Sequence, residues 1–394
     1  MAGGYAVCLQ PSAFSLQPSA FSLQPSAFSL QPSAWTPMRP LIAHIDLSAI
    51  QHNYALAKRC APGREAFAVV KANAYGHGVR EVVTALRDEA DGFAVACLEE
   101  AAEVRALHGT ARILLLEGCF EPSEFLVASQ LRLDIAVQGP EQLATLLASN
   151  LPQPLNVWLK LDSGMHRLGF SAEALRAVFP SLRGAPQVAE LNLMSHFACA
   201  DERGHMLTED QLECFLGLLD LDFDQRSLAN SAAVLGIPAA HMDWIRPGIM
   251  LYGASPFADL GAAEMGLRPA MSLHAQVMSI REVAVGESVG YGATWVAERP
   301  SRIGTVSCGY ADGYPRHAPS GTPVLVAGQR APLAGRVSMD MLAVDLTDLP
   351  EATVGAPVEL WGAQLAVDEV AAHAGTIGYE LLTKVTARVP RRYR

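Results

Sequence analysis

The sequence predicts a (β/α)8 barrel followed by a smaller, mostly β domain. From about residue 44, short apolar runs alternate with longer amphipathic segments, and this pattern repeats about eight times before residue 262. After that point, Gly and Pro interrupt a series of short β-like runs. Successive strand–helix units of this number are typical of a closed barrel, and short strands between turn residues are typical of a β domain. A doubly wound sheet is the alternative for the first part.

Eight apolar runs are the predicted strands of the barrel. They are Phe67–Lys71, Phe93–Ala96, Ile113–Leu116, Leu133–Val137, Leu155–Leu161, Ala189–His196, Arg226–Asn230 and Trp244–Met250. Helical patterns lie between most of them, as in Leu98–Leu107 and Glu141–Ala148. The carboxyl ends of barrel strands carry the chemistry, so polar residues at these ends are candidate site residues.

The second domain is expected to be all β. After the Gly- and Pro-containing segment GAAEMGLRPA, β-like runs occur at Leu273–Val285, Arg302–Ser307, Pro323–Val326, Leu342–Asp345, Val358–Leu360 and Lys384–Val389. We therefore assign residues 38–265 to the barrel and 266–394 to the β domain. The first residues after 38 are candidates for packing with the β domain.

The N-terminal segment is a repeat. From Leu9 to Trp35 the chain reads LQPSAFS three times and then LQPSAW, and the proline in each repeat excludes a continuous helix. No Lys or Arg precedes Arg39, so the charged region of a signal peptide is missing. We interpret residues 1–37 as a disordered, low-complexity extension. Our hypothesis is that Met38 is the natural start and that a chain beginning there folds and functions.

Composition and charge exclude several classes of function. Apolar residues make up 50% of the chain, enough for a sizeable core, and the net charge is −11 with no basic stripe. Such a chain is a poor binder of nucleic acid or anionic membranes, and no apolar run approaches the ~18 residues of a membrane span. The seven cysteines are scattered, and the eleven histidines show no metal spacing. We expect a cytoplasmic protein without a metal or a disulfide framework.

The strongest single motif is FAVVKANAYGHG, residues 67–78. A lysine at the end of a buried strand is costly unless it is paired or serves as a functional amine. For an isolated lysine, the ordinary alternative is a strand-end side chain that reaches solvent. Here Tyr75 follows four residues after Lys71, and Gly76 and Gly78 allow the backbone to approach a ligand closely. Lys71 is therefore the first candidate site residue.

Further motifs follow in a fixed order along the chain: KLDSGMHRLGF, SHFACAD, ANSAA, RPGIMLYG, GYGATW, GYADGYPR and GRVSMD. Together with the Lys71 segment, they resemble alanine racemases over nearly the whole chain from Met38. The resemblance implies a (β/α)8 barrel followed by a β domain, a homodimer with an active site shared between subunits, and pyridoxal phosphate (PLP) as cofactor. It also implies interconversion of L- and D-alanine, either to supply D-alanine to the cell wall or for catabolism.

The chemistry of racemisation explains which residue types are needed. Removing the α-proton of an amino acid requires an electron sink, which PLP provides. The resemblance assigns the covalent link to PLP, and a base on one face of the substrate, to the Lys71 amine. It assigns the proton donor on the other face to Tyr291 of the partner subunit. A phenol ionises near pH ~10, so a positive group must favour its ionised form, and Arg336 is the candidate. The ordinary alternative for Tyr291 is a strand tyrosine packed beside glycines.

The resemblance makes Arg246 the partner of the pyridine nitrogen. An arginine can only donate a hydrogen bond there, which leaves the ring neutral and favours racemisation over transamination. His196 resembles the residue that supports Arg246 and the ring, although a histidine at this position is more often a satisfied core residue. An isolated Arg–Pro pair is more often a surface turn.

The phosphate and the substrate are assigned further residues by resemblance. The phosphate candidates are Tyr75, Asn230, Ser231, Gly248, Ile249 and Tyr379, with backbone N–H groups suited to a dianion. Asn230 also reads as an ordinary helix cap. Arg167 is implied to contact the substrate carboxylate, and Met339 of the partner subunit is implied to line the substrate pocket. Lys160 matches a position that is often carbamylated and then holds Arg167, or it is a plain strand lysine. Tyr310 and Asp340 are supporting candidates.

Three rival functions remain. One is a racemase of the same fold with a wider pocket for serine or basic amino acids. Another is a related PLP barrel decarboxylase, which GYADGYPR and GYGATW disfavour. The third is a non-catalytic PLP-binding homeostasis protein, but such proteins resemble the barrel alone, and the roughly 130 residues after residue 262 argue against it. The sequence has no P-loop, GxGxxG, GxSxG or HExxH motif to favour another chemistry.

Overall fold

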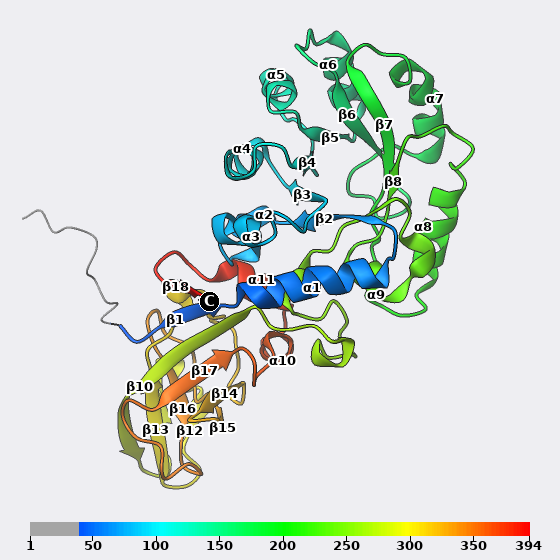
Figure 1. Cartoon of the computed structure of the whole chain (residues 1–394). Coiled ribbons are helices and arrows are strands. Elements are labelled where there is room, and N and C mark those ends of the chain that lie inside the picture. Colours follow the sequence, from blue (N-terminus) through cyan, green and yellow to red (C-terminus); the bar gives the residue numbers. More distant parts are fainter. Residues whose placement is uncertain (1–38) are drawn as a thin grey trace, which may run out of the picture. The chain divides into compact units, whose positions relative to one another are not determined.

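Eight parallel strands close into a barrel in the computed structural model, which describes residues 39–394 (Figure 1). The N-terminal repeat, and with it our interpretation of residues 1–37, lies outside the described residues. The barrel strands are β2 (Glu65–Val69), β3 (Gly92–Val95), β4 (Arg112–Leu115), β5 (Asp134–Val137), β6 (Leu155–Lys160), β7 (Val188–Met194), β8 (Arg226–Ser227) and β9 (Trp244–Ile245). Strand β2 pairs with both β3 and β9 and so closes the ring. The predicted barrel is confirmed, and the doubly wound alternative is wrong.

The last two barrel strands are shorter than predicted. The apolar runs that begin at Arg226 and Trp244 leave the ladder after two residues and continue as turns. The first run leads to Asn230, which caps helix α9 (Ser231–Gly236), and the second leads to a 3-10 helix at Ile249–Tyr252. These turns stay buried, which explains why their apolar sequence resembles a strand.

Helices follow the strands in the order expected for a barrel. They are α1 (Leu47–Cys60), α3 (Val79–Ala85), α4 (Leu98–Leu107), α5 (Pro122–Gln130), α6 (Pro140–Ala148), α7 (Ala172–Leu182), α8 (Met206–Leu216) and α9. The predicted helix at residues 98–107 is confirmed at both ends, and α6 begins one residue before the predicted Glu141. Proline at the first turn suits that start, because its missing N–H would have no helical partner there.

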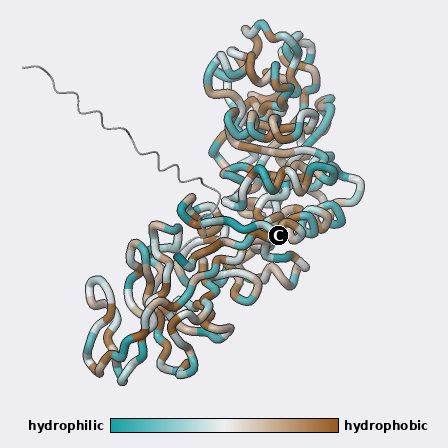
Figure 2. The backbone as a smooth tube through the Cα atoms, turned by 60° about the vertical axis from the view of Figure 1, so that its left-hand side comes forward, coloured by the Kyte–Doolittle hydropathy of each residue, from teal (hydrophilic) through white to brown (hydrophobic). Residues whose placement is uncertain are grey.

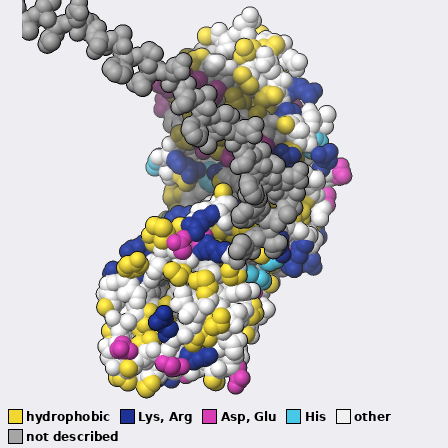
Figure 3. All heavy atoms as spheres, turned by 90° about the vertical axis from the view of Figure 1, so that its left-hand side faces the viewer, with side chains coloured by type: hydrophobic (Ala, Val, Ile, Leu, Met, Phe, Trp, Pro, Cys, Tyr) yellow, Lys and Arg dark blue, Asp and Glu magenta, His cyan; other side chains and the backbone are white. Residues whose placement is uncertain are grey.

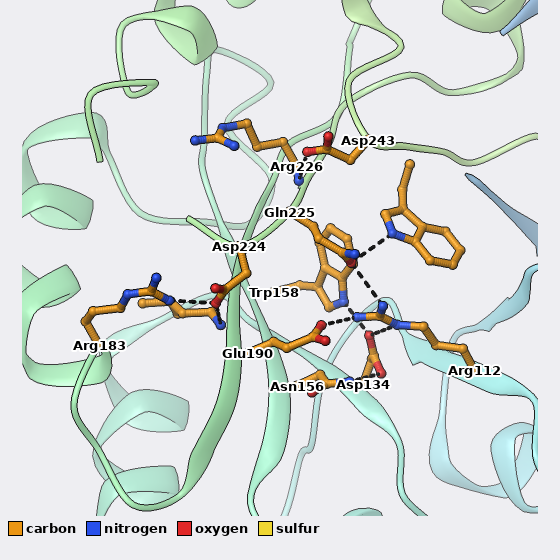
Figure 4. Close-up of polar contacts among 12 residues, drawn as sticks. Arg112, Asp134, Asn156, Trp158, Arg183, Glu190, Asp224, Gln225, Arg226 and Asp243 are labelled. Carbon is orange, nitrogen blue, oxygen red and sulfur yellow. Dashed lines mark hydrogen bonds and ion pairs between the residues drawn. The ribbon is translucent and has the colours of Figure 1, made fainter. Parts of the chain in front are cut away.

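Aromatic side chains fill the barrel interior. Phe67 of β2 stacks on Trp244 of β9 with ring centroids 4.0 Å apart, and it meets Trp158 of β6 edge-on at 5.8 Å. All three are buried. Below them, Arg112 of β4 forms ion pairs with Asp134 and Glu190 at the amino-terminal end of the strands (Figure 4). Paired charged side chains fill this end of the barrel, and the active site of such a barrel lies at the opposite end.

The β domain is one mixed sheet. Its strands are β1 (Ile42–Ile45), β10 (Met271–Val283), β13 (Ser301–Val306), β14 (Pro323–Val326), β15 (Gln329–Pro332), β16 (Leu342–Asp345), β17 (Pro357–Trp361) and β18 (Arg391–Tyr393). Strand β10 is central and pairs with β1, β13 and β17. A separate two-stranded ribbon pairs β11 (Ser288–Val289) with β12 (Trp295–Val296).

Along the chain, hydrophobic segments run through the interior and hydrophilic ones lie more often at outer turns (Figure 2).

The second domain is mostly β, as its sequence predicts, but two finer expectations for it are wrong. The domain is not all β, because α10 (Val367–His373) and α11 (Gly378–Lys384) follow β17. The predicted strand at Lys384–Val389 does not form. Lys384 instead ends α11. The Arg391 guanidinium donates to the carbonyls of Val385, Thr386 and Val389 and so stabilises a turn there. The strand begins only at Arg391 and runs parallel to β1.

Candidate active site

A cavity of about 680 Å³ lies at the carboxyl ends of the barrel strands. Its lining includes eleven residues singled out from the sequence: Lys71, Tyr75, Lys160, Arg167, His196, Asn230, Ser231, Arg246, Gly248, Ile249 and Tyr379. They come from several strand ends and, for Tyr379, from helix α11. Side chains that are far apart in the sequence therefore share one cavity, as expected for a barrel active site.

Lys71 and Tyr75 enter the same cavity because the chain reverses between them. After β2, residues Ala72 to Tyr75 have φ angles of 54°, 53°, 52° and 51°, which is a left-handed helical turn of four non-glycine residues. Each residue in this region costs about 1–3 kcal/mol, so the surroundings must hold it in place. Strain of this kind is concentrated at functional sites.

Several bonds hold this left-handed turn. The amide of Ala72 donates to Glu100 on α4 at 2.7 Å, and the amide of Val79 donates to the Asn73 side chain at 2.8 Å. Arg391 of β18 donates to the carbonyl of Gly76 at 2.7 Å. Glu100 and Arg391 were not singled out in the sequence, because only the fold brings them to this turn.

Arg246 is buried among neutral acceptors. Arg246 is only 4% exposed. Its guanidinium donates to the hydroxyl of Ser227 and to the carbonyls of Ser195 (2.5 Å) and Leu228 (3.3 Å). Within residues 39–394 no carboxylate pairs with it. Burial lowers the pKa of Arg246 to about 10, so it remains protonated near neutral pH. Its positive charge is therefore available to a group in the cavity.

Gly248 forms a cradle beside Tyr75 and Ser231. A Cβ on Gly248 would lie 2.7 Å from the Tyr75 hydroxyl, so a side chain there would fill the space. The Ser231 hydroxyl accepts from the amide of Gly248 at 2.8 Å and from that of Met250 at 3.3 Å. Asn230 accepts from the amide of Ala233, so its side chain does act as the helix cap. Burial raises the pKa of Tyr75, which keeps its hydroxyl protonated and able to donate.

Positive charge gathers in the cavity. Burial, followed by the charges of Arg246 and Arg167, lowers the pKa of Lys160 to about 8. Burial, with help from Arg246 and Lys160, also lowers the pKa of His196 well below its usual value, so its imidazole is neutral. These shifts are those expected of cations forced together in a poorly solvated site. An anionic ligand would relieve that repulsion.

The other predicted residues lie on the β domain and outside this cavity. Tyr291 is 69% exposed, Met339 is 53% exposed and Tyr310 is 37% exposed. The turn that carries Tyr291 packs on Arg336, since a Cβ on Gly292 would lie 2.8 Å from the Arg336 guanidinium. Asp340 follows Met339 and pairs with Arg388 at 2.7 Å. Tyr291, Tyr310 and Met339 are thus exposed on the β domain and do not line the cavity that contains Lys71 of the same chain.

Neither a metal site nor a membrane span is found in the part of the chain that the structure describes. No cluster of His, Cys, Asp or Glu there could hold a metal ion. No helix among residues 39–394 combines the length and apolarity that crossing a bilayer requires.

Comparisons with known proteins agree with this arrangement. The family model described as "Alanine racemase, N-terminal domain" matches residues 45–256, and "Alanine racemase, C-terminal domain" matches residues 270–393. The biosynthetic alanine racemase of Pseudomonas aeruginosa is 80% identical over 356 residues, which are 90% of this chain and 99% of that protein.

Solved structures match in the same way. The crystal structure of biosynthetic alanine racemase from Pseudomonas aeruginosa superposes with a TM-score of 0.90 at 79% identity, covering 91% of this chain and 100% of the other. Alanine racemase from Bartonella henselae with covalently bound pyridoxal phosphate superposes with a TM-score of 0.82 at 30% identity, covering 90% and 99%. Family models, relatives and fold all lead to one conclusion: this chain belongs to the alanine racemase family.

Proposed function

We propose that this protein interconverts L- and D-alanine, with pyridoxal phosphate as its cofactor. The observation that carries the proposal is the sharing of one cavity by the Lys71 amine and by Lys160, Arg167 and Arg246. An amine that can join an aldehyde, surrounded by cations that can hold a phosphate and a carboxylate, suits an amino-acid enzyme of this kind. The Pseudomonas aeruginosa relative is named biosynthetic, which supports a role in supplying D-alanine for the cell wall.

The residues of the cavity fit the cofactor. The cradle between Tyr75, Ser231 and Gly248 has the donors and the open space that a phosphate needs, and Ile249, Asn230 and Tyr379 complete its lining. Arg246, held by neutral acceptors, would donate to the pyridine nitrogen, and the neutral His196 would lie beside it. Lys71 would hold the aldehyde carbon. When bound, pyridoxal phosphate supplies an electron sink for the α-carbon of the substrate.

Two groups of this protein would handle the α-proton. Lys71 Nζ would take or return it on one face, and Tyr291 of the partner subunit would do so on the other. The proposal of a homodimer is supported by the exposure of Tyr291, Met339 and Tyr310, because a partner subunit would cover these large side chains. Hydrophobic side chains are also spread over the visible face of the β domain (Figure 3).

The substrate would be held at its carboxylate and limited in size. The Arg167 guanidinium suits a carboxylate, and Lys160, if carbamylated, would become an acceptor that orients Arg167. Burial lowers the pKa of Lys160 to about 8, so more of its amine is neutral near neutral pH than in an exposed lysine, and carbamylation requires the neutral amine. Met339 of the partner subunit would close the pocket against larger side chains. We also propose a cytoplasmic location, which the scattered cysteines support.

A coupled assay tests this proposal. The purified full-length protein with pyridoxal phosphate is tested on a panel of L-amino acids, and D-isomers are detected by an oxidase. We expect turnover of alanine above that of serine, lysine and arginine. We expect Lys71→Ala to lose both the yellow colour of the bound cofactor and the turnover. Strong turnover of lysine or arginine with none of alanine would overturn the substrate assignment.

The role of Tyr291 has its own test. Tyr291→Phe should still bind pyridoxal phosphate, because the residues that would hold the cofactor come from the barrel and α11. It should lose exchange of the α-proton with deuterated solvent from one alanine enantiomer and keep exchange from the other. Normal exchange from both enantiomers would contradict the assignment of two proton carriers.

A further inference from the structure

Two turns of the β domain are locked together. The 3-10 turn at Tyr310–Asp312 lies against the turn at residues 338–341, with the amide of Tyr310 donating to the Ser338 carbonyl at 3.0 Å and that of Ala311 to the Met339 carbonyl at 2.9 Å. A Cβ on Gly309 would lie 2.4 Å from both of these carbonyl oxygens, so only glycine allows this approach. The two turns therefore move as one unit.

A buried carboxylate anchors this unit. The Asp312 side chain is fully buried and accepts from the amide of Gly309 at 2.9 Å. Arg39 donates to both of its oxygens, at 2.5 and 2.7 Å, in a bidentate pair. Arg388 approaches the same carboxylate at 3.1 Å. Charge-assisted, bidentate bonds of this kind are the strongest side-chain hydrogen bonds in proteins.

The same two arginines also hold the second turn. The Arg39 guanidinium donates to the carbonyl of Asp340 at 2.6 Å, and the Arg388 guanidinium pairs with the Asp340 carboxylate at 2.7 Å. Each arginine thus spans from the buried Asp312 to the residue next to Met339. Two positive and two negative charges are balanced at this point, which limits the cost of burying Asp312.

Opposite ends of the described chain supply these arginines. Arg39 precedes β1, and the carbonyl of the neighbouring Pro40 accepts from Ser307 at 2.7 Å. Arg388 lies in the turn after α11, where the amide of Thr386 donates to the carbonyl of Asp312 at 3.1 Å. The guanidinium groups are therefore themselves placed by ordered backbone.

The side chains that this arrangement presents point outward. Met339 is 53% exposed and Tyr310 is 37% exposed, although the backbone beneath them is locked by the bonds above. We propose that Arg39 and Arg388 are positioning residues that act through Asp312 to hold Met339 and Tyr310 where the partner subunit's substrate pocket needs them. This inference rests on the proposed function, in which Met339 of one subunit closes the substrate pocket of its partner, and it extends that role to Tyr310.

Arg39→Gln is the direct test, in the full-length holoenzyme. It removes the bidentate pair and the bond to Asp340 and leaves Arg388 in place. We expect the KM for alanine to rise about tenfold, because only part of the free energy of the three lost bonds would act on the position of Met339. The affinity for pyridoxal phosphate and the absorbance of the bound cofactor should not change, because the cofactor residues come from the barrel and α11. A merely structural role would lower cofactor binding and the amount of active enzyme and leave KM unchanged.

Two further variants make the test decisive. Arg39→Lys keeps one ion pair but cannot form the fork, so its KM should fall between those of the parent and Arg39→Gln. Arg39→Lys also tests the positioning role if Arg39→Gln fails to fold. The matched control is Arg330→Gln, which breaks a similar bidentate pair with Glu369 on the surface of the same domain. Its KM should equal that of the parent protein.

The outcomes separate this inference from the proposed function. If the parent protein racemises alanine and Tyr291→Phe loses exchange on one face, yet Arg39→Gln and Arg39→Lys keep the parent KM, the positioning role is wrong. A rise in KM in Arg330→Gln equal to that in Arg39→Gln would also overturn it. If the parent protein does not racemise alanine, or Tyr291→Phe is unaffected, the proposed function itself fails.

Discussion

Arg112 offers a quantitative test of how the barrel is held together. Its guanidinium lies 2.8 Å from Asp134 and 2.6 Å from Glu190, and it is 5.0 Å from the ring of Trp244 (Figure 4). Arg112→Met keeps an apolar side chain beside the rings of Trp158 and Trp244 but removes the positive charge. The Asp134 side chain, which is 3% exposed, then has no counter-charge and keeps only its neutral donors, among them Trp158.

The expected cost follows from that unpaired carboxylate. Removing one partner of a buried ion pair typically costs about 3–5 kcal/mol of folding free energy. Burial raises the pKa of Asp134 even with Arg112 present, whose charge opposes the rise. Without Arg112 the pKa must rise further. An acid whose folded pKa is raised destabilises the fold above that pKa, so the deficit should be largest at high pH and shrink as Asp134 takes up a proton.

Unfolding midpoints at about pH 8 and about pH 5.5 measure this effect. The control is Arg183→Met, which breaks exposed pairs with Asp222 and Asp224 in the same region and should cost no more than about 1 kcal/mol. The KM for alanine should not change in Arg112→Met, because Arg112 lies at the end of the barrel away from the cavity. The reasoning is refuted if Arg112→Met is as stable as Arg183→Met. It is also refuted if the loss of folding free energy in Arg112→Met grows as the pH falls.

Three further variants test separate features. Gly248→Ala places a Cβ 2.7 Å from the Tyr75 hydroxyl, so it should weaken binding of pyridoxal phosphate at least about tenfold in equilibrium dialysis. The control Gly109→Ala, whose Cβ would have no atom within 4 Å, should bind the cofactor as the parent protein does. Ser227→Ala leaves a buried guanidinium nitrogen without its acceptor and should cost about 1–3 kcal/mol in thermal unfolding; an unchanged midpoint would contradict this. A chain beginning at Met38 should fold with the kcat of the full chain, and an insoluble or inactive product would disprove our view of the extension.

Much of the barrel could be predicted from the sequence because its strands are continuous apolar runs. Strand β2 ends two residues before Lys71, and polar residues follow other strand ends, which is where the active site of a barrel lies. Lys71 stands out from the residues themselves, the resemblance to alanine racemases implied the other cavity residues, and the structure brings all eleven together. Asn230 shows how a single residue can fit two interpretations, since its side chain caps a helix that also borders the cavity.

Other features depend on contacts that no local pattern reveals. The left-handed turn at Ala72–Tyr75 contains no glycine, and besides its own Asn73 it is held by Glu100 and Arg391, which only the fold brings to it. The pairing of Arg39 with Asp312 joins residues 273 positions apart. Lys384–Val389 alternates like a strand, yet Lys384 is the last residue of helix α11 and Arg391 donates to carbonyls of the residues after it. Tertiary contacts outweigh local propensity in each case.

Subunit mixing tests most directly whether one site is built from two chains. Lys71→Ala and Tyr291→Phe should each be inactive in racemisation, and the two variants are mixed in equal amounts, unfolded together and refolded. If Lys71 of one subunit works with Tyr291 of the other, each hybrid dimer has one intact site, and the mixture should recover about a quarter of the activity of the parent protein. If hybrids form but the mixture is no more active than the two variants alone, Lys71 and Tyr291 do not act across the interface.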